Sequence, residues 1–231
     1  MIDFKFAPEG YPFLFGSFLL TVFVALVLFW IWRTGGSAGL VSALFISLCF
    51  LLCITAFMAY FFRDPERIVP EGRGLFVSPA DGKVILVKDV YEQGYLQADA
   101  KEISIFMSPL NVHVNRAPCT GKVTYVKHTP GQFIAAYKDD ASIKNENIVM
   151  ALEGEQGRVL VRQVAGFVAR RAVCRVKPGD LLTRGERYGM IKFGSRLDVY
   201  LPLDAQILVK PGDRVLAGET VIATVHTDSR E

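Results

Sequence analysis

Two long apolar runs at the start of the chain constrain its fold more than any other feature. No charged residue occurs from Tyr11 to Trp32, and none occurs from Gly35 to Phe62. Each run reaches the roughly 20 residues that a helix needs to cross the hydrocarbon layer of a membrane. The turn between them is short and contains two glycines. The sequence therefore predicts an α-helical hairpin, 1–62, that either spans a membrane or dips into one leaflet as a re-entrant anchor.

Basic residues at the ends of these runs favour one orientation. Arg63, Arg67 and Arg73 follow the second run closely, whereas Arg33 alone lies in the turn. Cytoplasmic segments next to membrane helices are enriched in Lys and Arg. We therefore expect residues 63–231 to lie on the cytoplasmic side of the cell membrane.

The overall charge and the cysteines exclude several classes of site. The formal net charge is +3, and the four charged residues of 1–62 cancel, so the mild excess lies in 63–231. Such a surface suits contact with anionic lipid, and nucleic acid is not needed to explain it. The cysteines form no CxxC pair, so we expect no zinc or thioredoxin-like site and no other metal site. They are Cys49, Cys53, Cys119 and Cys174.

Residues 63–231 read as a second domain that is mostly β. Short runs rich in β-branched residues alternate with Gly, Pro and Asp turns. No long segment after residue 65 shows the 3.6-residue apolar period of a helix. Strands are expected at Val84–Val87, Ile103–Met107, Lys122–Val126, Ile148–Leu152, Val159–Val164, Met190–Phe193, Leu197–Leu201, Ile207–Val209 and Val221–Val225.

Two pairs of short segments repeat within this domain. Lys177-Pro-Gly-Asp180 recurs as Lys210-Pro-Gly-Asp213, and Gly-Glu follows each copy. Pro79-Ala-Asp-Gly-Lys-Val84 recurs loosely as Pro118-Cys-Thr-Gly-Lys-Val123. A turn, a strand and a glycine at fixed spacing resemble the halves of lipoyl- and biotinyl-carrier domains. We therefore expect a small sandwich or barrel element of that kind, which by itself says little about function.

Three residues of this domain are candidates for catalysis. The hydroxyl of Ser195 is a weak nucleophile until a base removes its proton. His113 is a suitable base, because an imidazole with an ordinary pKa near 6.5 exchanges protons at neutral pH. Asp81 could orient that imidazole, which would complete an Asp–His–Ser constellation. Taken singly, each residue also fits a structural role in a turn or a strand.

The segments around these residues resemble the pyruvoyl-dependent phosphatidylserine decarboxylases, specifically the short prokaryotic type. The similarity runs from about residue 8 to residue 227. No single motif is decisive, but the order and spacing of the motifs are specific. The matching segments are Phe61–Arg67, Ser78–Val84, Met107–Pro118, Gly131–Phe133, Asn145–Asn147, Gln163–Arg171 and Lys192–Tyr200.

The resemblance implies a proenzyme that cuts itself between Gly194 and Ser195. Glycine suits the position before the serine because it tolerates unusual backbone angles. The cut would give fragments 1–194 and 195–231 and turn Ser195 into a covalent pyruvoyl cofactor. The cofactor would form a Schiff base with phosphatidylserine, release carbon dioxide and give phosphatidylethanolamine, a step of phospholipid biosynthesis. The fragments would remain together as a heterodimer, and a homodimer also fits the resemblance.

Cationic side chains are the candidates for binding the anionic headgroup of the substrate. Arg63, Arg67 and Arg116 are the residues we select. Arg63 and Arg67 fit equally well as ordinary positive flanks of a membrane helix. Relatives of the long type carry a second histidine where this chain has Arg116 or a neighbour, so one histidine, His113, would serve both maturation and turnover.

Two other functions are compatible with the sequence. The substrate could be an ether-linked archaeal phosphoserine lipid, since its headgroup chemistry is the same. The chain could also be a non-enzymatic membrane adaptor built on a lipoyl-like β-domain. The internal repeats favour the adaptor, but it gives no reason for the set of Asp81, His113 and Ser195.

Overall fold

The computed structural model divides the chain into two compact units, Met1–Pro65 and Glu66–Glu231. It describes residues 5–132, 134, 144–166, 171–192 and 195–225. Residues 63 and 64 belong to the first unit because Phe6 forms a β-bridge with Arg63 and the Asp64 N–H donates to the Lys5 carbonyl over 2.7 Å.

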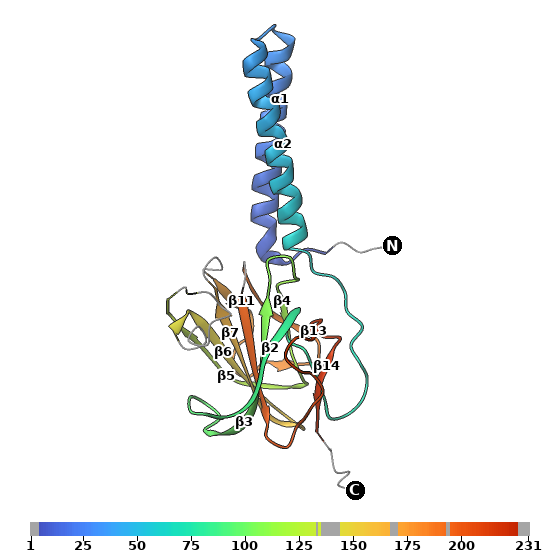
Figure 1. Cartoon of the computed structure of the whole chain (residues 1–231), viewed down its shortest axis with the longest axis vertical. Helices are drawn as coiled ribbons and strands as arrows, with labels where there is room; N and C mark the ends of the chain where they lie inside the picture. The colour runs from blue at the N-terminus through green and yellow to red at the C-terminus, as the bar shows by residue number, and fades with distance from the viewer. Residues whose placement is uncertain (1–4, 133, 135–143, 167–170, 193–194, 226–231) are drawn as a thin grey trace. The chain divides into compact units, whose positions relative to one another are not determined.

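The first unit is the predicted helical hairpin. A short 3-10 helix (η1, Pro8–Gly10) leads into α1 (Tyr11–Arg33), and α2 (Ala38–Phe61) returns beside it (Figure 1). Gly35 makes the turn with a left-handed φ of 77°. The Thr21 and Thr55 hydroxyl oxygens, 3.3 Å apart, link the two helices.

The outward surface of this hairpin is apolar. Side chains such as Phe15, Phe23 and Trp30 are more than half exposed. Helices of 23 and 24 residues are about 35 Å long, enough to cross a hydrocarbon layer of about 30 Å. Both are thus long and apolar enough to cross a membrane, although spanning, dipping and orientation stay predictions.

The second unit is built from β-strands, as predicted. Its main sheet has eight strands in the order β13-β2-β3-β11-β7-β6-β5-β9, and it curls in space (Figure 1). Two three-stranded sheets, β1-β14-β12 and β4-β10-β8, complete it. The strands are β1 (Leu75–Val77), β2 (Gly82–Glu92), β3 (Ala98–Met107), β4 (Val114–Arg116), β5 (Gly121–Thr129), β6 (Asn147–Gly154), β7 (Gly157–Ala165), β8 (Ala172–Cys174), β9 (Leu181–Leu182), β10 (Arg187–Ile191), β11 (Ser195–Pro202), β12 (Gln206–Ile207), β13 (Arg214–Val215) and β14 (Val221–Thr224).

Strand β11 lies in the middle of the main sheet, antiparallel to β3 on one side and β7 on the other. Successive side chains of a strand point to opposite faces. Leu197 and Val199 enter the apolar core with Ile103 and Ile105 of β3. The side chains of the other face are buried as well, so both faces of β11 are shielded from water.

The internal sequence repeats correspond to repeated substructures. In each Lys-Pro-Gly-Asp turn the aspartate accepts the N–H of the lysine, over 2.8 Å at Asp180 and 2.9 Å at Asp213. The first turn leads to β9, which pairs with β5, and the second leads to β13, which pairs with β2. The Thr120 hydroxyl accepts the Arg184 N–H over 3.0 Å, and Asp81 accepts the Ala217 N–H in the same way over 2.8 Å. Asp81 therefore occupies the position that Thr120 holds in the other copy.

Two glycines of the second copy test this geometry. Gly212 and Gly218 have φ values of 105° and 78°, but only at Gly218 would an added Cβ meet a neighbour, the Arg116 Cδ at 2.9 Å. We expect Gly212→Ala to lower the free energy of unfolding by about 1 kcal/mol through backbone strain. Gly218→Ala should cost about 3 kcal/mol, because overpacking adds to the strain. Urea unfolding followed by circular dichroism measures both, and equal losses would contradict the packing argument.

The turn after β2 is organised by the buried carboxylate of Glu92. It accepts the backbone N–H groups of Gly94, Tyr95 and Leu96 over 3.0, 2.7 and 2.7 Å. Burial alone would raise the pKa of Glu92, but these three donors and the charge of Arg162 outweigh it and hold the pKa below its ordinary value of 4.5.

A lowered pKa makes the contribution of Glu92 to stability depend on pH. The contribution is complete above the pKa of the unfolded chain and is lost as the pH falls through the lower pKa of the folded chain. We therefore expect Glu92→Gln to lower the melting temperature at pH 7. The difference from the wild type should shrink progressively below about pH 4.5. Melting curves of both proteins between pH 7 and pH 3 test this, and a constant difference would contradict it.

Candidate active site

Ser195 is the first residue of β11 and is completely buried. It lies opposite Met107 of β3 and opposite Ala165 of β7. Its hydroxyl points to the Met107 sulfur, 3.4 Å from Oγ to Sδ. A thioether is a weak acceptor, so this contact leaves the hydroxyl proton weakly held. Gly194, the other predicted cleavage residue, lies outside the described residues.

The segment with Asp81 meets the same end of β3 from the other side. β2 pairs with β3 so that Lys83 lies opposite Phe106. The position before Lys83 must be a glycine, because a Cβ at Gly82 would lie 2.3 Å from the Phe106 carbonyl oxygen. Asp81 directly precedes Gly82 in the chain. The end of β3 is therefore flanked by Asp81 on one side and Ser195 on the other.

The segment with His113 follows the same end of β3 in the chain. After Met107 the chain turns, with the Asn111 N–H donating to the Ser108 carbonyl over 3.0 Å. His113 follows this turn and is fully buried. Its carbonyl accepts the Ile191 N–H over 3.2 Å, which ties it to β10, the strand before Ser195. The topology thus brings the three predicted catalytic segments to one end of the sheet.

One contact fixes the tautomer of His113. Its Nδ1 lies 2.9 Å from the Asn111 carbonyl oxygen. Because a carbonyl only accepts, Nδ1 must carry the hydrogen of a neutral ring, and Nε2 keeps a lone pair. In this neutral tautomer, Nε2 is the nitrogen that can accept a proton. The predicted orienting of His113 by Asp81 stays a prediction, since the acceptor facing Nδ1 is Asn111.

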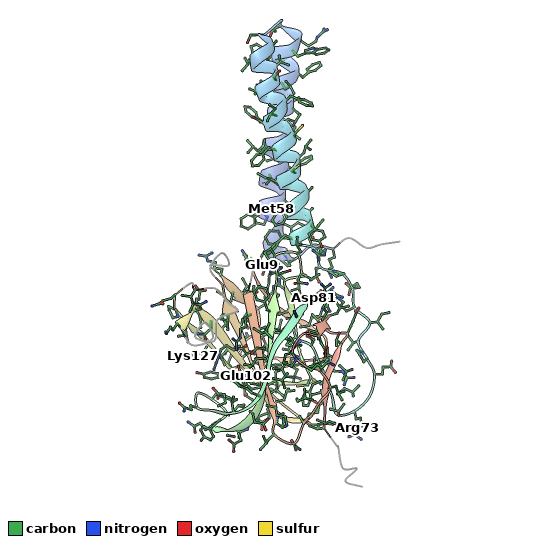
Figure 2. The ribbon with its side chains drawn as sticks, viewed as in Figure 1. Glu9, Met58, Arg73, Asp81, Glu102 and Lys127 are labelled. Atoms are coloured by element: carbon green, nitrogen blue, oxygen red, sulfur yellow. The ribbon has the colours of Figure 1, made fainter. Side chains whose placement is uncertain are left out.

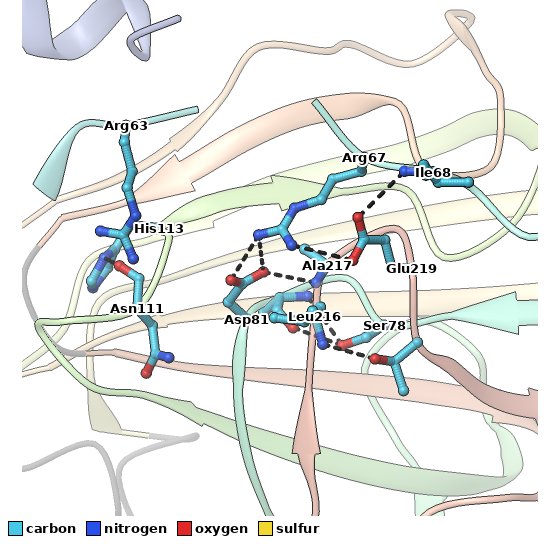
Figure 3. Close-up of polar contacts among 12 residues, drawn as sticks. Arg63, Arg67, Ile68, Ser78, Asp81, Asn111, His113, Leu216, Ala217 and Glu219 are labelled. Carbon is cyan, nitrogen blue, oxygen red and sulfur yellow. Dashed lines mark hydrogen bonds and ion pairs between the residues drawn. The ribbon is translucent and has the colours of Figure 1, made fainter. Parts of the chain in front are cut away.

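Asp81 is buried and strongly bound in its own right. The Arg67 Nη2 donates to both of its carboxylate oxygens, over 3.1 and 2.9 Å (Figure 3). The Ala217 N–H donates to one of the same oxygens over 2.8 Å. Arg67 also reaches Glu219, with 3.4 Å between Nη1 and Oε2. Paired donors of this kind favour the charged form of a buried carboxylate.

The three arginines predicted to bind the headgroup have other partners in the structure. Arg67 is only 9% exposed and pairs with Asp81. Arg116 is buried and donates to the Gly185 carbonyl over 2.9 Å. Arg63 donates to the Tyr60 carbonyl over 2.6 Å and stacks on the Tyr60 ring. Their predicted role in lipid binding stays untested.

Sequence reasoning missed two buried side-chain amides near Met107. Asn115 lies next to its sulfur, and Gln163 holds Asn115. The Asn115 Nδ2 lies 3.9 Å from the Met107 sulfur. The Gln163 Nε2 donates to the Asn115 Oδ1 over 2.8 Å and to the Val173 carbonyl over 3.2 Å. The Asn115 Oδ1 and the Val173 carbonyl both accept hydrogen bonds, so Gln163 must point its amino group at them. The amino group of Asn115 must therefore point toward the Met107 sulfur. A buried polar residue in a strand as short as β4 leaves no periodic signal.

The two cysteines of this unit are poorly suited to act as nucleophiles. Burial raises the pKa of the Cys119 thiol to about 12 and also raises that of Cys174, so both stay protonated at neutral pH. Within the described residues, no three His, Cys, Asp or Glu side chains gather into a metal-binding group.

Comparison with known proteins identifies the family. Residues 54–223 match the sequence model described as phosphatidylserine decarboxylase. The chain belongs to the phosphatidylserine decarboxylase family. Members of this family are carboxy-lyases, so the chain is an enzyme of that class.

Individual relatives in the family cover nearly the whole chain. The protein from Symbiobacterium thermophilum is 45% identical over 217 residues, 94% of either chain. That from Pelobacter propionicus is 47% identical over 217 residues, 93% of this chain and 94% of its own. That from Beijerinckia indica is 45% identical over 224 residues, 96% of this chain and 90% of its own. Each is named phosphatidylserine decarboxylase proenzyme.

The buried ion pair between Arg67 and Asp81 should stabilise this unit. Removing one partner of a buried pair leaves the other charge uncompensated. We expect Arg67→Ala to lower the free energy of unfolding by about 3 kcal/mol, with Arg67→Lys intermediate. Arg73→Ala is the matched control, because the Arg73–Glu155 pair is exposed on both sides and should contribute less than about 1 kcal/mol. Similar losses in urea unfolding of the two alanine variants would contradict this assignment.

Proposed function

We propose that this chain is a membrane-anchored proenzyme that converts phosphatidylserine to phosphatidylethanolamine through a pyruvoyl group made from Ser195. The observation that carries the proposal is the meeting of the Asp81, His113 and Ser195 segments at one end of β3 in a member of this family. The relatives' names add that they are proenzymes and act on phosphatidylserine.

The first step is the cleavage of the chain by its own side chains. The His113 Nε2 accepts the proton of the Ser195 hydroxyl, and the Ser195 oxygen attacks the carbonyl carbon of Gly194. The carbon–nitrogen bond breaks as the acyl group moves to oxygen, which gives an ester. The Ser195 hydroxyl donates to the Met107 thioether, which is a weak acceptor, and a weakly held proton favours this reaction.

Elimination then separates the two fragments. A base removes the α-proton of Ser195, and the Cβ–Oγ bond breaks. Gly194 leaves as the carboxylate end of 1–194, and residue 195 becomes dehydroalanine. Tautomerisation and addition of one water release ammonia and leave the pyruvoyl group at the start of 195–231.

The surroundings of Ser195 fit a small neutral carbonyl group. The position is completely buried between Met107 and Ala165, two uncharged residues. When formed, the pyruvoyl group supplies a ketone that takes up the substrate amine and accepts electrons as carbon dioxide leaves. His113 then holds the proton that replaces the lost carboxylate. Asp81, which pairs with Arg67, would support the positive charge that His113 carries at that stage.

The two fragments would stay together after the cut. β11 belongs to 195–231 but pairs on both sides with strands of 1–194. Ala217 and Glu219 of the small fragment also bind Asp81 and Arg67 of the large one. The helical hairpin would anchor this heterodimer in the cell membrane, with the catalytic unit on the cytoplasmic side.

Intact-mass spectrometry of the full chain, purified in detergent, tests the proposal. The wild-type protein should give fragments 1–194 and 195–231, the smaller one lighter by one ammonia than a serine-started chain. Ser195→Ala should remain a single chain. His113→Ala should slow the cut by at least about 100-fold, because a general base contributes at least that factor.

His128→Ala serves as the matched control. His128 is half exposed and pairs with Glu146, so this variant should be cut at the normal rate. Cleaved wild-type protein should then release carbon dioxide from vesicles of phosphatidylserine, and an ether-linked phosphoserine lipid tests the alternative substrate. An uncut wild-type chain with an ordinary Ser195 would sink the proposal.

A further inference from the structure

An ionic cluster is buried on the face of β11 that points away from the apolar core. Arg196 and Asp198 of β11 are 3% and 0% exposed, and Glu102 and Ser104 of β3 are 5% and 0% exposed. Figure 2 labels Glu102 within the β-unit. We call these four residues the Arg196 cluster. Burial of so many polar groups is unusual unless each one has a partner.

The contacts within the Arg196 cluster centre on the guanidinium group. Its Nη2 donates to Ser104 Oγ over 2.8 Å and lies 3.3 Å from Glu102 Oε1, and its Nε donates to Asp198 over 2.5 Å. Lys88 lies 3.4 Å from the other Glu102 oxygen and balances the second negative charge. Burial opposes the charge of Arg196, but Asp198 and Glu102 raise its pKa above the usual value. Arg196 is therefore charged at every pH at which the protein folds.

The Arg196 cluster crosses the proposed cleavage point. Arg196 and Asp198 belong to fragment 195–231, whereas Glu102 and Ser104 belong to fragment 1–194. Arg196 is also the residue next to Ser195. Its bonds therefore attach the new start of the small fragment to β3, the strand that carries Met107 on the reacting face.

Cleavage would leave the start of β11 less firmly held, and this attachment would keep it in position. The first residue of β11 becomes a chain end, and chain ends fray unless they are tied down. The core face of β11 carries Leu197, Val199 and Leu201, which are similar in size. A slip by two residues would keep these side chains on the same face, so the apolar face defines the register weakly. On the other face Arg196 and Asp198 have opposite charges and cannot exchange places.

We propose that Arg196 is a positioning residue of the mature enzyme, which holds the start of β11 in register against Glu102 and Ser104 once the chain is cut. This inference rests on the proposed self-cleavage. Before the cut, the covalent link to β10 restrains residue 195 as well. The Arg196 cluster is therefore needed for turnover more than for maturation.

The test separates maturation from turnover. Arg196→Met alone removes the cation shared by two buried carboxylates and can prevent folding, so the main variant is the neutral triple Arg196→Met, Asp198→Asn and Glu102→Gln. Glu92→Gln is the matched control: Glu92 is a buried acid, and its backbone donors and Arg162 all lie in 1–194. The full-length proteins are compared for extent of cleavage, carbon dioxide released per pyruvoyl group, and hydrogen exchange of residues 195–201.

We expect the triple variant to be cut to the wild-type extent but to turn over at least about tenfold more slowly, since small misplacements of reacting groups are costly. Its hydrogen exchange should rise in 195–201 only after cleavage, and not in an uncut version that also carries Ser195→Ala. Arg196→Lys should keep part of the rate that the triple variant loses. Glu92→Gln lowers the melting temperature but should match the wild type in cleavage and in turnover.

Three results would overturn the inference. They are normal turnover per pyruvoyl group in the triple variant, equal exchange before and after its cleavage, or loss of cleavage itself in a folded triple variant. Failure of the wild-type chain to cut itself would instead reject the proposed function, so the two failures can be told apart.

Discussion

The pairing of β11 between β3 and β7 is the constraint on which the rest of the catalytic unit depends. Because Ser195 lies opposite Met107, its position is set by a ladder of backbone hydrogen bonds and not by a flexible loop. The start of β2 places the segment with Asp81 beside this end of β3, and the turn after β3 places the segment with His113 there. Sites carried on strands are held more precisely than sites on loops.

Buried ion pairs lie at two places around β11, and both are shielded from water, unlike ordinary surface ion pairs. Arg67 and Asp81 form a shielded ion pair beside the reacting face, and the Arg196 cluster lies on the opposite face. The Arg73–Glu155 pair is open to water and contributes little. A buried pair is costly to form and more costly to break, so both sites demand one particular arrangement of the neighbouring strands.

The sequence predicted the features that arise from local patterns. The charge-free runs predicted the hairpin, and runs of β-branched residues predicted strands that overlap the observed ones, from β2 to β14. The repeated turns also proved equivalent, because Asp180 and Asp213 bind their backbones alike. Most strands of two or three residues, such as β4 and β9, were missed, since so few residues show no period. The partners of Arg67 could not be predicted, because sequence spacing does not reveal contacts with residues as distant as Glu219.

The repeated substructure also bears on the order of events in maturation. One copy, with β5 and β9, lies wholly within 1–194. The other pairs β2 of 1–194 with β13 of 195–231, so neither fragment contains it complete. As a single chain the two parts find each other at high effective concentration, whereas separate fragments would depend on their encounter. Under the proposed self-cleavage, we therefore expect folding to precede scission, so that the intact precursor serves as its own assembly template.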